Sequence, residues 1–170
     1  MSSNNQKLIK GIIICRESGE YLLDLILDSE INPMLLSSFV GALSLFGKHN
    51  LGKIEEIEIK GLDVGMVIVY KYSLILITIM AKDFMKNNIR KESEKTLDMF
   101  YSSYSKEIKD TNGCVDLSIF NDFKKLLYFQ IQDYFEIITD KERKAKVGDY
   151  GFFTPFLRKL RNGQSQKESS

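Results

Sequence analysis

The sequence is poor in the residues on which many catalytic and metal sites depend. Its 170 residues include one histidine, His49, and two cysteines, Cys15 and Cys114. A site built from several histidines is therefore excluded, and a histidine-based triad would have to use His49 itself. Neither cysteine belongs to a Cys-x-x-Cys pair, so structural zinc is not expected. The composition favours a protein without a metal or a cofactor.

The chain also lacks an excess of charge and a long uninterrupted apolar run. It has 24 basic and 23 acidic residues, which argues against a nucleic-acid binder. The most apolar stretch, residues 64–81, is interrupted by Lys71, Tyr72 and Ser73, so it predicts a hairpin rather than a membrane span. Residues 1–7 are polar and no small-residue cleavage site follows them, so we expect a cytoplasmic protein.

A nucleotide-binding loop is missing as well. The segment from Gly41 to His49 is superficially similar to a phosphate loop, but five residues separate Gly41 from Gly47 where the motif has four. The motif also requires Ser or Thr at the position of His49. The acidic residues of 55–58 are typical of a solvated strand edge. We therefore do not expect an enzyme.

The first third of the chain predicts a hairpin. Residues 8–15 form a nearly continuous apolar run, which favours a strand buried on both faces. Residues 17–20 are typical of a turn, where Gly19 can take a positive φ. Residues 21–27 predict the second strand, and in the buried first strand we expect Cys15 to behave as a small apolar side chain.

A helix is predicted over residues 34–49. Asn32 followed by Pro33 favours a helix start, with an N-cap and then proline at the first helical position. The helix carries an apolar stripe, and small residues beside it allow another backbone to approach closely. The stripe consists of Leu36, Phe39, Val40, Leu43 and Phe46, and the small residues are Ser37, Ser38, Gly41, Ala42 and Ser44.

Three strands and two helices are predicted after this helix. Residues 54–60 alternate between acidic and apolar side chains, which favours a half-exposed edge strand. Residues 64–70 and 74–80 predict a hairpin, and residues 84–109 and 116–138 predict amphipathic helices that cover the sheet. The predicted α+β (α/β) fold is a five-stranded antiparallel sheet in the order β-β-α-β-β-β-α-α, with one helix between strands 2 and 3 and two helices at the end.

The domain is predicted to end at residue 139, and residues 140–170 form a basic, partly disordered tail. Residues 141–170 carry a net charge of +5, whereas the preceding 140 residues sum to −4. A short aromatic amphipathic segment in the tail either folds back onto its own domain, or docks in a partner's groove, or contacts an anionic membrane surface. Its expected docking residues are Phe152, Phe153, Phe156, Leu157 and Arg158.

Residues 7–139 resemble a longin domain. Residues 32–48, Asn-Pro-Met-Leu-Leu-Ser-Ser-Phe-Val-Gly-Ala-Leu-Ser-Leu-Phe-Gly-Lys, resemble the first helix of archaeal longin-like proteins and of the first longin domain in Rab-activating complexes. The opening Gly11-Ile12-Ile13-Ile14, Ser18-Gly19 and Tyr21-Leu22-Leu23 is similar to the first hairpin of those proteins. The sibling roadblock family begins with a helix, and the predicted opening hairpin therefore favours the longin family.

The resemblance implies a non-enzymatic platform that pairs with another longin or roadblock domain, as a homodimer or heterodimer, and binds a small Ras-like GTPase in trafficking-type processes. In many such pairs the first helix and the third strand form the joint. The expected partner-binding residues are then Ser37, Ser38, Gly41, Ser44, Ile54, Glu56 and Glu58. The alternative is a PAS-like sensor of a small ligand, which would need a polar internal cavity, whereas the predicted core is Ile, Leu, Val, Phe and Met.

Overall fold

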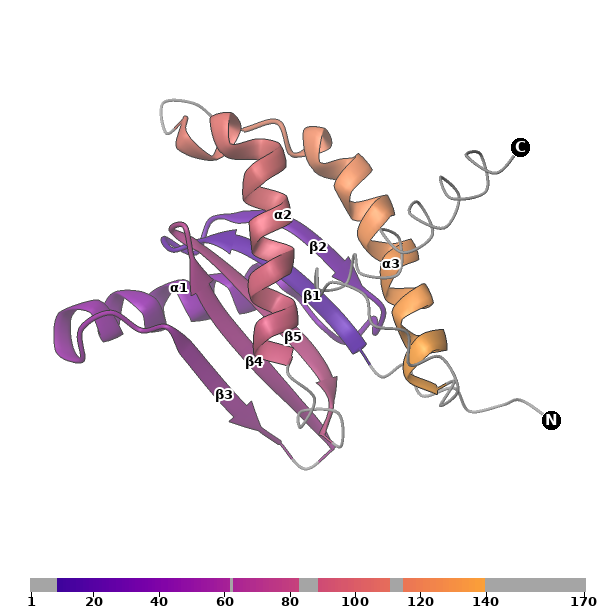
Figure 1. The fold of residues 1–170 in the computed structure, drawn as a ribbon. Coiled ribbons are helices and arrows are strands. Elements are labelled where there is room, and N and C mark those ends of the chain that lie inside the picture. The colour runs from indigo at the N-terminus through magenta and orange to yellow at the C-terminus, as the bar shows by residue number, and fades with distance from the viewer. Residues whose placement is uncertain (1–8, 62, 83–88, 111–114, 140–170) are drawn as a thin grey trace.

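The computed structural model describes residues 9–61, 63–82, 89–110 and 115–139, and of residues 133–139 only the backbone. The order of elements is the predicted one (Figure 1). The bounds are β1 Ile9–Arg16, β2 Tyr21–Ile26, α1 Pro33–Asn50, β3 Glu56–Lys60, β4 Val64–Lys71, β5 Leu74–Ala81, α2 Ile89–Lys109, the 3₁₀ helix η2 Leu117–Phe120 and α3 Asn121–Thr139.

The strands form one antiparallel sheet in the order β2-β1-β5-β4-β3. β1 lies in the middle because it pairs with β2 on one side and with β5 on the other. β2 and β3 are the two edges of the sheet. The prediction that residues 54–60 contain an edge strand is confirmed, although β3 begins at Glu56 rather than at Ile54.

Tight turns join the hairpins. Gly19 has a φ of 89° in the turn between β1 and β2, as its position in the sequence predicts. Tyr72 and Ser73 have φ values of 58° and 59°, so the β4–β5 hairpin closes through a two-residue turn of the type that matches the twist of the strands. The Tyr72 ring stacks on the ring of Tyr101 in α2, with centroids 4.3 Å apart, and fixes the tip of this hairpin to the helix.

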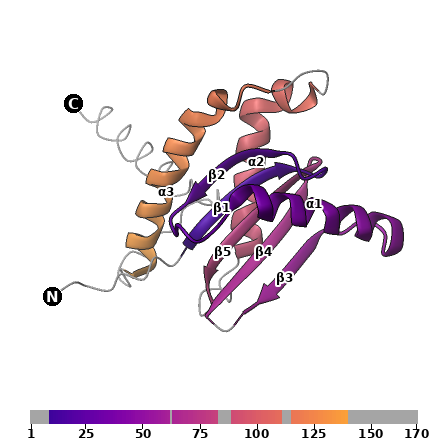
Figure 2. The ribbon, with the colours of Figure 1, turned by 180° about the vertical axis from the view of Figure 1, so that it is seen from behind.

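The sheet lies between two helical layers (Figures 1 and 2). Helices α2 and α3 cover one face, and α1 lies on the other. The buried side chains accordingly form one cluster on each face of the sheet. The residues that recur at helical spacing in the last two helices are buried or half-buried where the structure describes them, and they are Ile89, Ser93, Leu97, Phe100, Tyr104, Ile108, Phe120, Phe123, Leu127 and Ile131.

β1 is buried on both faces, as predicted. Ile12 and Ile14 belong to the cluster under α2 and α3, whereas Ile13 and Cys15 belong to the cluster on the α1 side. Burial raises the pKa of the Cys15 thiol to about 12, so at neutral pH it is a protonated, apolar core group. This confirms the prediction for Cys15, while Cys114 lies outside the described residues.

Arg16, at the end of β1, holds the C-terminus of α2. Its Nη1 donates to the carbonyl of Ile108, and its Nη2 lies 3.4 Å from the carbonyls of both Glu107 and Asp110. Glu20 Oε2 lies 2.9 Å from Arg16 Nε on the other side of the guanidinium. The last carbonyls of a helix have no partners within the helix, and the guanidinium supplies both hydrogen bonds and a favourable positive charge.

Replacement of Arg16 by methionine, which keeps most of the aliphatic stem, is expected to lower the free energy of unfolding by about 2 kcal/mol, because charge-assisted hydrogen bonds at a largely buried position are lost. Urea-induced unfolding followed by circular dichroism measures this loss. Lys125→Met serves as the control, because Lys125 is well exposed and its ion pair with Asp122 spans 3.8 Å. Equal stability of the two variants would show that Arg16 does not anchor the helix.

Candidate partner-binding surface

Helix α1 begins where the sequence predicts. Asn32 adopts an extended conformation, and its Oδ1 accepts a hydrogen bond from the backbone N of Leu35 at 3.0 Å. Pro33 occupies the first helical turn, where its missing N–H leaves no intrahelical bond unmade. At the other end, Gly52 takes a φ of 88° and turns the chain back toward β3. The cap and this turn fix the length of the helix.

The side of α1 that faces the sheet is made of small residues. Its buried members are Ser37, Val40, Gly41, Ser44 and Gly47. A Cβ atom on Gly41 would lie 2.4 Å from the Cα of Gly19, so helix and hairpin turn touch at their backbones. A Cβ atom on Gly47 would lie 1.9 Å from Cδ1 of Ile54, so the absence of a side chain on Gly47 makes room for the Ile54 side chain.

This packing differs from the predicted apolar stripe. Of the five stripe residues, Val40 is fully buried, Leu36 and Leu43 are half-buried, and Phe39 and Phe46 are exposed. The reason is the backbone contact with the turn at Gly19, because a bulky side chain on that side would push the helix away from the sheet. The small residues therefore face inward, and the phenylalanines lie on the opposite side of the helix.

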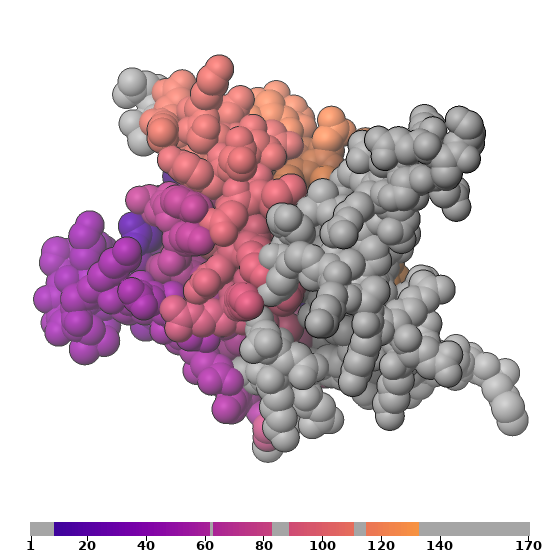
Figure 3. Space-filling model, viewed as in Figure 1, coloured from indigo at the N-terminus to yellow at the C-terminus, as the bar shows by residue number. Residues whose placement is uncertain are grey.

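The outward side of α1 is consequently apolar. Five large apolar side chains of α1 are more than half exposed, one of which, Leu45, lies on the flank toward the β1–β2 turn: Met34 at 64%, Leu35 at 71%, Phe39 at 53%, Leu45 at 60% and Phe46 at 57%. We call this set the outer face of α1. In the space-filling view, the purple atoms of α1 form one end of the molecule (Figure 3). An exposed apolar cluster of this kind on a folded domain is typical of a surface that binds a partner.

Strand β3 supplies open backbone groups beside this helix. Glu55 accepts from the backbone N of Tyr70, and Gly61 donates to the carbonyl of Val64. Because hydrogen-bonded pairs alternate along an antiparallel ladder, Ile57 and Ile59 bond to β4. The backbone groups of the alternate residues therefore point to the open edge, and these residues are Glu56, Glu58 and Lys60.

The charges of β3 lie on the α2 side of the sheet. Arg90 of α2 binds Glu56 and Glu94 at 2.9 Å each, and its Nη2 lies 3.7 Å from Glu55. The hydrogen bond with Glu94 and the charge of Glu56 raise the pKa of Arg90. Within β3, Lys60 Nζ lies 3.2 Å from Glu58 Oε1. The acidic edge is thus largely compensated by nearby cations.

The opposite edge, β2, is guarded by other elements. Helix α3 and η2 both contact this strand. Lys124 of α3 reaches Asp24 of β2, with Nζ and Oδ1 3.5 Å apart. Two surface cavities, of about 470 and 260 Å³, lie between β2 and these helices and share Asn121 and Lys124. Of the two edges, β3 is therefore the more accessible to another strand.

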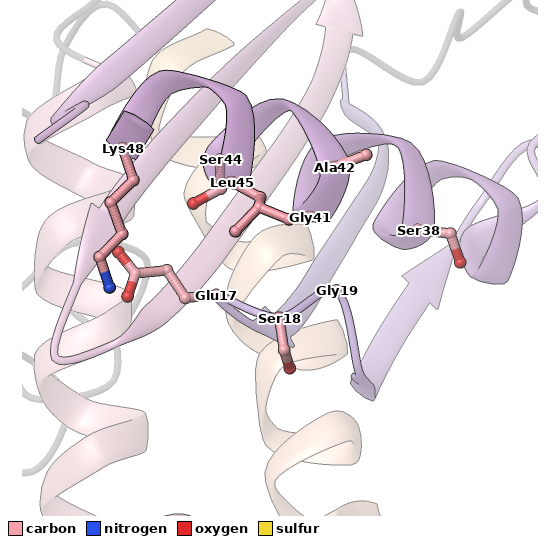
Figure 4. Close-up of a pocket in the computed structure, with 9 residues that line it drawn as sticks. All are labelled: Glu17, Ser18, Gly19, Ser38, Gly41, Ala42, Ser44, Leu45 and Lys48. Atoms are coloured by element: carbon pink, nitrogen blue, oxygen red, sulfur yellow. The ribbon is translucent and has the colours of Figure 1, made fainter. Parts of the chain in front are cut away.

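A further cavity, of about 570 Å³, opens between the β1–β2 turn and α1 (Figure 4). Ser38, Ser44 and Lys48 line it from the helix, and Glu17 and Ser18 line it from the turn. The side chains of Lys48 and Glu17 point toward one another across its mouth. It lies beside the Gly19–Gly41 contact, so its walls are set by the same close approach of helix and turn.

The predicted partner-binding residues fall into two groups. Ser37, Gly41 and Ser44 are buried against the sheet, where they bring α1 close to the hairpin. The others reach the surface on α1, in the connector and on β3, and they are Ser38, Ile54, Glu56 and Glu58. The sequence reasoning missed Met34, Leu35 and Leu45 of the outer face. Their signal was a second apolar side on a helix whose other side holds small residues.

The predicted tail-docking residues, Phe152, Phe153, Phe156, Leu157 and Arg158, lie outside the described residues. In the described part of the chain, no group of three or more His, Cys, Asp or Glu side chains is placed to hold a metal ion. Among the described helices, none combines the length and the apolar character needed to cross a membrane.

Comparison with known proteins reveals similarity of fold. No family model matches the chain, and no curated protein matches its sequence. The structure is similar to a Roadblock/LC7 domain from Streptomyces avermitilis, with a TM-score of 0.47 and 9% identity over 56% of this chain and 84% of that one. It is similar to MglB from Myxococcus xanthus, with a TM-score of 0.45 and 15% identity over 55% and 78% of the two chains. It is also similar to the gliding protein MglB from Thermus thermophilus, with a TM-score of 0.40 and 10% identity over 46% of this chain and 65% of that one. This similarity concerns the course of the backbone alone.

Proposed function

We propose that this chain is a non-enzymatic interaction module of the longin type, which pairs with a second longin or roadblock domain and, as a pair, binds a small Ras-like GTPase. The resemblance of the β1–β2 hairpin and of residues 32–48 to the first hairpin and the first helix of longin domains supports the assignment to the longin branch. The described residues supply the physical basis for pairing, whereas the binding of a small GTPase is inferred from the resemblance to longin domains.

Two observations carry the proposal: α1 has an exposed apolar outer face, and β3 has an open strand edge, which is joined to α1 by the connector whose Ile54 packs on Gly47. A partner that adds a strand to β3 satisfies the outward backbone groups of this strand, and its own helix or sheet can cover the apolar outer face. A specific interface removes roughly 800 Å² from water on each partner, and its energetic centre is usually a few large side chains. Phe39, Leu45 and Phe46 are side chains of that kind.

The predicted residues Ser38, Ile54, Glu56 and Glu58 remain in the proposed contact, because they lie at or beside this surface. Ser37, Gly41 and Ser44 have an indirect role in the proposal. By allowing α1 to approach the hairpin turn, they set the position of the outer face relative to β3.

The pairing is tested by sedimentation velocity of the purified chain over a range of concentrations, alone and mixed with longin or roadblock domains from the same organism. We expect a concentration-dependent dimer or a stoichiometric heterodimer. A chain that stays monomeric in every mixture would contradict the proposal.

The GTPase part of the proposal needs a separate measurement. A platform without a phosphate loop of its own acts on a GTPase by holding or opening the switch loops, which are order–disorder elements. Release of a fluorescent guanine nucleotide from each small GTPase of the same organism is therefore measured with and without the paired module. We expect at least one GTPase to bind with a changed release rate, and an unchanged rate together with no binding across the set would refute this part.

A further inference from the structure

The cavity between α1 and the β1–β2 turn is lined largely by polar groups, whereas the outer face of α1 is apolar. Its volume is about 570 Å³, and its walls come from the helix and from residues 17–19 of the turn. Gly41 and Gly19 belong to the lining, and their backbones touch because no side chain separates them. A small molecule in the cavity would therefore contact the helix and the turn at once.

Ser44 brings a buried hydroxyl group to this cavity. The residue is only 7% exposed, and its hydroxyl points from the helix toward the turn (Figure 4). Ser37 and Ser38 use their hydroxyls within the helix, where they donate to the carbonyl of Met34 at 3.1 and 2.9 Å. The Ser44 hydroxyl has no such partner among the described residues. Because an unpaired buried hydroxyl is unfavourable, a polar ligand atom beside Ser44 would gain a hydrogen bond that the chain does not use.

A second buried hydroxyl without a partner lies under the helix. Tyr70 of β4 packs in the cluster on the α1 side, and its hydroxyl oxygen makes no hydrogen bond to the described residues. Burial, the neighbouring Cys15 and the Glu17 carboxylate raise the pKa of Tyr70 to about 12. The Tyr70 hydroxyl therefore stays protonated at neutral pH and lies within electrostatic reach of Glu17, which forms one wall of the cavity.

The mouth of the cavity carries one charge of each sign. Glu17 of the turn and Lys48 of the helix point toward one another (Figure 4), yet neither forms an ion pair with the other or with another described residue. On β3, by contrast, Glu56 is already paired with Arg90 at 2.9 Å. A carboxylate and an ammonium group that face each other across a gap match a ligand that itself carries an ammonium and a carboxylate group.

We infer that this cavity binds a free α-amino acid with an uncharged polar side chain. The ammonium group of the ligand pairs with Glu17, its carboxylate pairs with Lys48, and its side chain extends toward the hydroxyl of Ser44, which can both donate and accept. The cavity volume falls in the range of small-molecule sites, roughly 300 to 1,000 Å³. A simple anion or cation would use only one of the two charges. The inference goes beyond the proposed pairing and does not depend on it.

Titration of the isotope-labelled full chain with L-serine, L-asparagine and L-glutamine, followed by the NMR shifts of the backbone amides, tests the inference. We expect saturable shifts at Gly19 and Gly41, one on each wall of the cavity. The corresponding amino-acid amides lack the carboxylate and the N-acetyl derivatives lack the ammonium group. Each derivative should bind about tenfold more weakly or worse, because one charge-assisted pair is lost. L-Leucine keeps both charges and should bind more weakly than L-asparagine, because its side chain leaves the Ser44 hydroxyl unpaired.

Ser44→Ala separates a binding role from a structural one. The variant should bind the best of these amino acids about fivefold more weakly, because one hydrogen bond is lost. Its free energy of unfolding should stay equal or rise, because the change removes an unpaired buried hydroxyl and alanine has the higher helix propensity. A hydroxyl that served the fold would give the opposite result in urea unfolding followed by circular dichroism.

Glu17→Gln and Lys48→Gln remove the two charges at the mouth one at a time. Each variant should weaken binding by about tenfold and leave the fold unchanged, because neither charge has an ion pair to lose. Lys125→Gln is the matched control, because Lys125 lies on α3 and is well exposed. Its affinity for the amino acid should equal that of the wild type.

The possible results decide between this ligand and other occupants. The absence of localised shifts with all three amino acids up to about 10 mM would overturn the inference. Equal binding of the amides or the N-acetyl derivatives would overturn the recognition of both charged groups. Binding that Ser44→Ala and Lys48→Gln leave unchanged would place the ligand elsewhere on the chain. Shifts of Gly19 and Gly41 that occur only on addition of a longin or roadblock domain would assign the cavity to the partner interface and not to a small molecule.

Discussion

A chain with valine in place of Gly41 is expected to lose about 3 kcal/mol or more of its free energy of unfolding. The Cβ atom would lie 2.4 Å from the Cα of Gly19 and 2.6 Å from its backbone N, and backbone atoms cannot rotate away as a side chain can. Relief requires either that α1 lifts off the sheet or that the β1–β2 turn moves. Gly19 itself cannot easily change, because its φ of 89° is unfavourable for other residues.

Denaturant unfolding measured by circular dichroism determines the loss. Gly41→Ala should show a smaller effect, because alanine gains roughly 1 kcal/mol of helix propensity over glycine. Ala42→Val is the matched control, since Ala42 is the next residue and is exposed; this change loses about 0.5 kcal/mol of helix propensity, whereas Gly41→Val gains a similar amount. If Gly41→Val and Ala42→Val are equally stable, the close contact of helix and turn does not exist in solution.

Replacement of Phe46 by lysine is expected to weaken pairing by about 30-fold or more while leaving the fold intact. Truncation or charging of a central apolar side chain in an interface typically costs about 2 kcal/mol or more. The side chain is 57% exposed in the single chain, so its removal takes little from the core. A cation one turn from the end of α1 is favourable for the helix dipole, and thermal stability should therefore change little.

Phe129→Lys is the control for this experiment. Phe129 is 62% exposed on α3, beside the guarded β2 edge and on a different element from the outer face of α1. It presents the same change of side chain at a similar exposure, so a general effect of removing surface phenylalanine would appear in both variants. Sedimentation equilibrium measures the dimer constants. Equal dimer constants for the two variants would exclude the outer face of α1 from the interface.

The order of elements was predictable because each strand and helix has its own periodicity. The run of residues 8–15 can be buried on both faces only as a central strand, and β1 is that strand. The alternation of residues 54–60 likewise predicted an edge strand. The last helix was predicted to begin directly after Asp116, whereas Asp116 first caps η2 by accepting from the backbone N of Ser118 at 2.9 Å. Local patterns do not distinguish such a 3₁₀ turn from the start of an α-helix.

The orientation of α1 was not predictable from its own residues. Either side of the helix could be buried, one because its side chains are apolar and the other because its side chains are small. The choice depends on Gly19, 22 residues earlier in the chain, which permits a backbone contact that no helical periodicity encodes. Since the partner surface is whatever side of α1 remains outside, this single contact also decides which residues the surface contains.

The central position of β1 also affects the order in which the chain can fold. The strand is made before both of its neighbours: β2 follows after a short turn, but β5 begins only at Leu74. During synthesis, the β5-facing side of β1 therefore remains unpaired until β5 has left the ribosome. The open backbone edge here is flanked by apolar side chains on both faces of the strand, those of Ile12, Ile13, Ile14 and Cys15. An unpaired strand edge of this kind promotes aggregation. The β4–β5 hairpin has a tight turn and can form locally, so β5 can pair with β1 as part of a preformed hairpin. This shortens the time for which the edge of β1 stays unpaired.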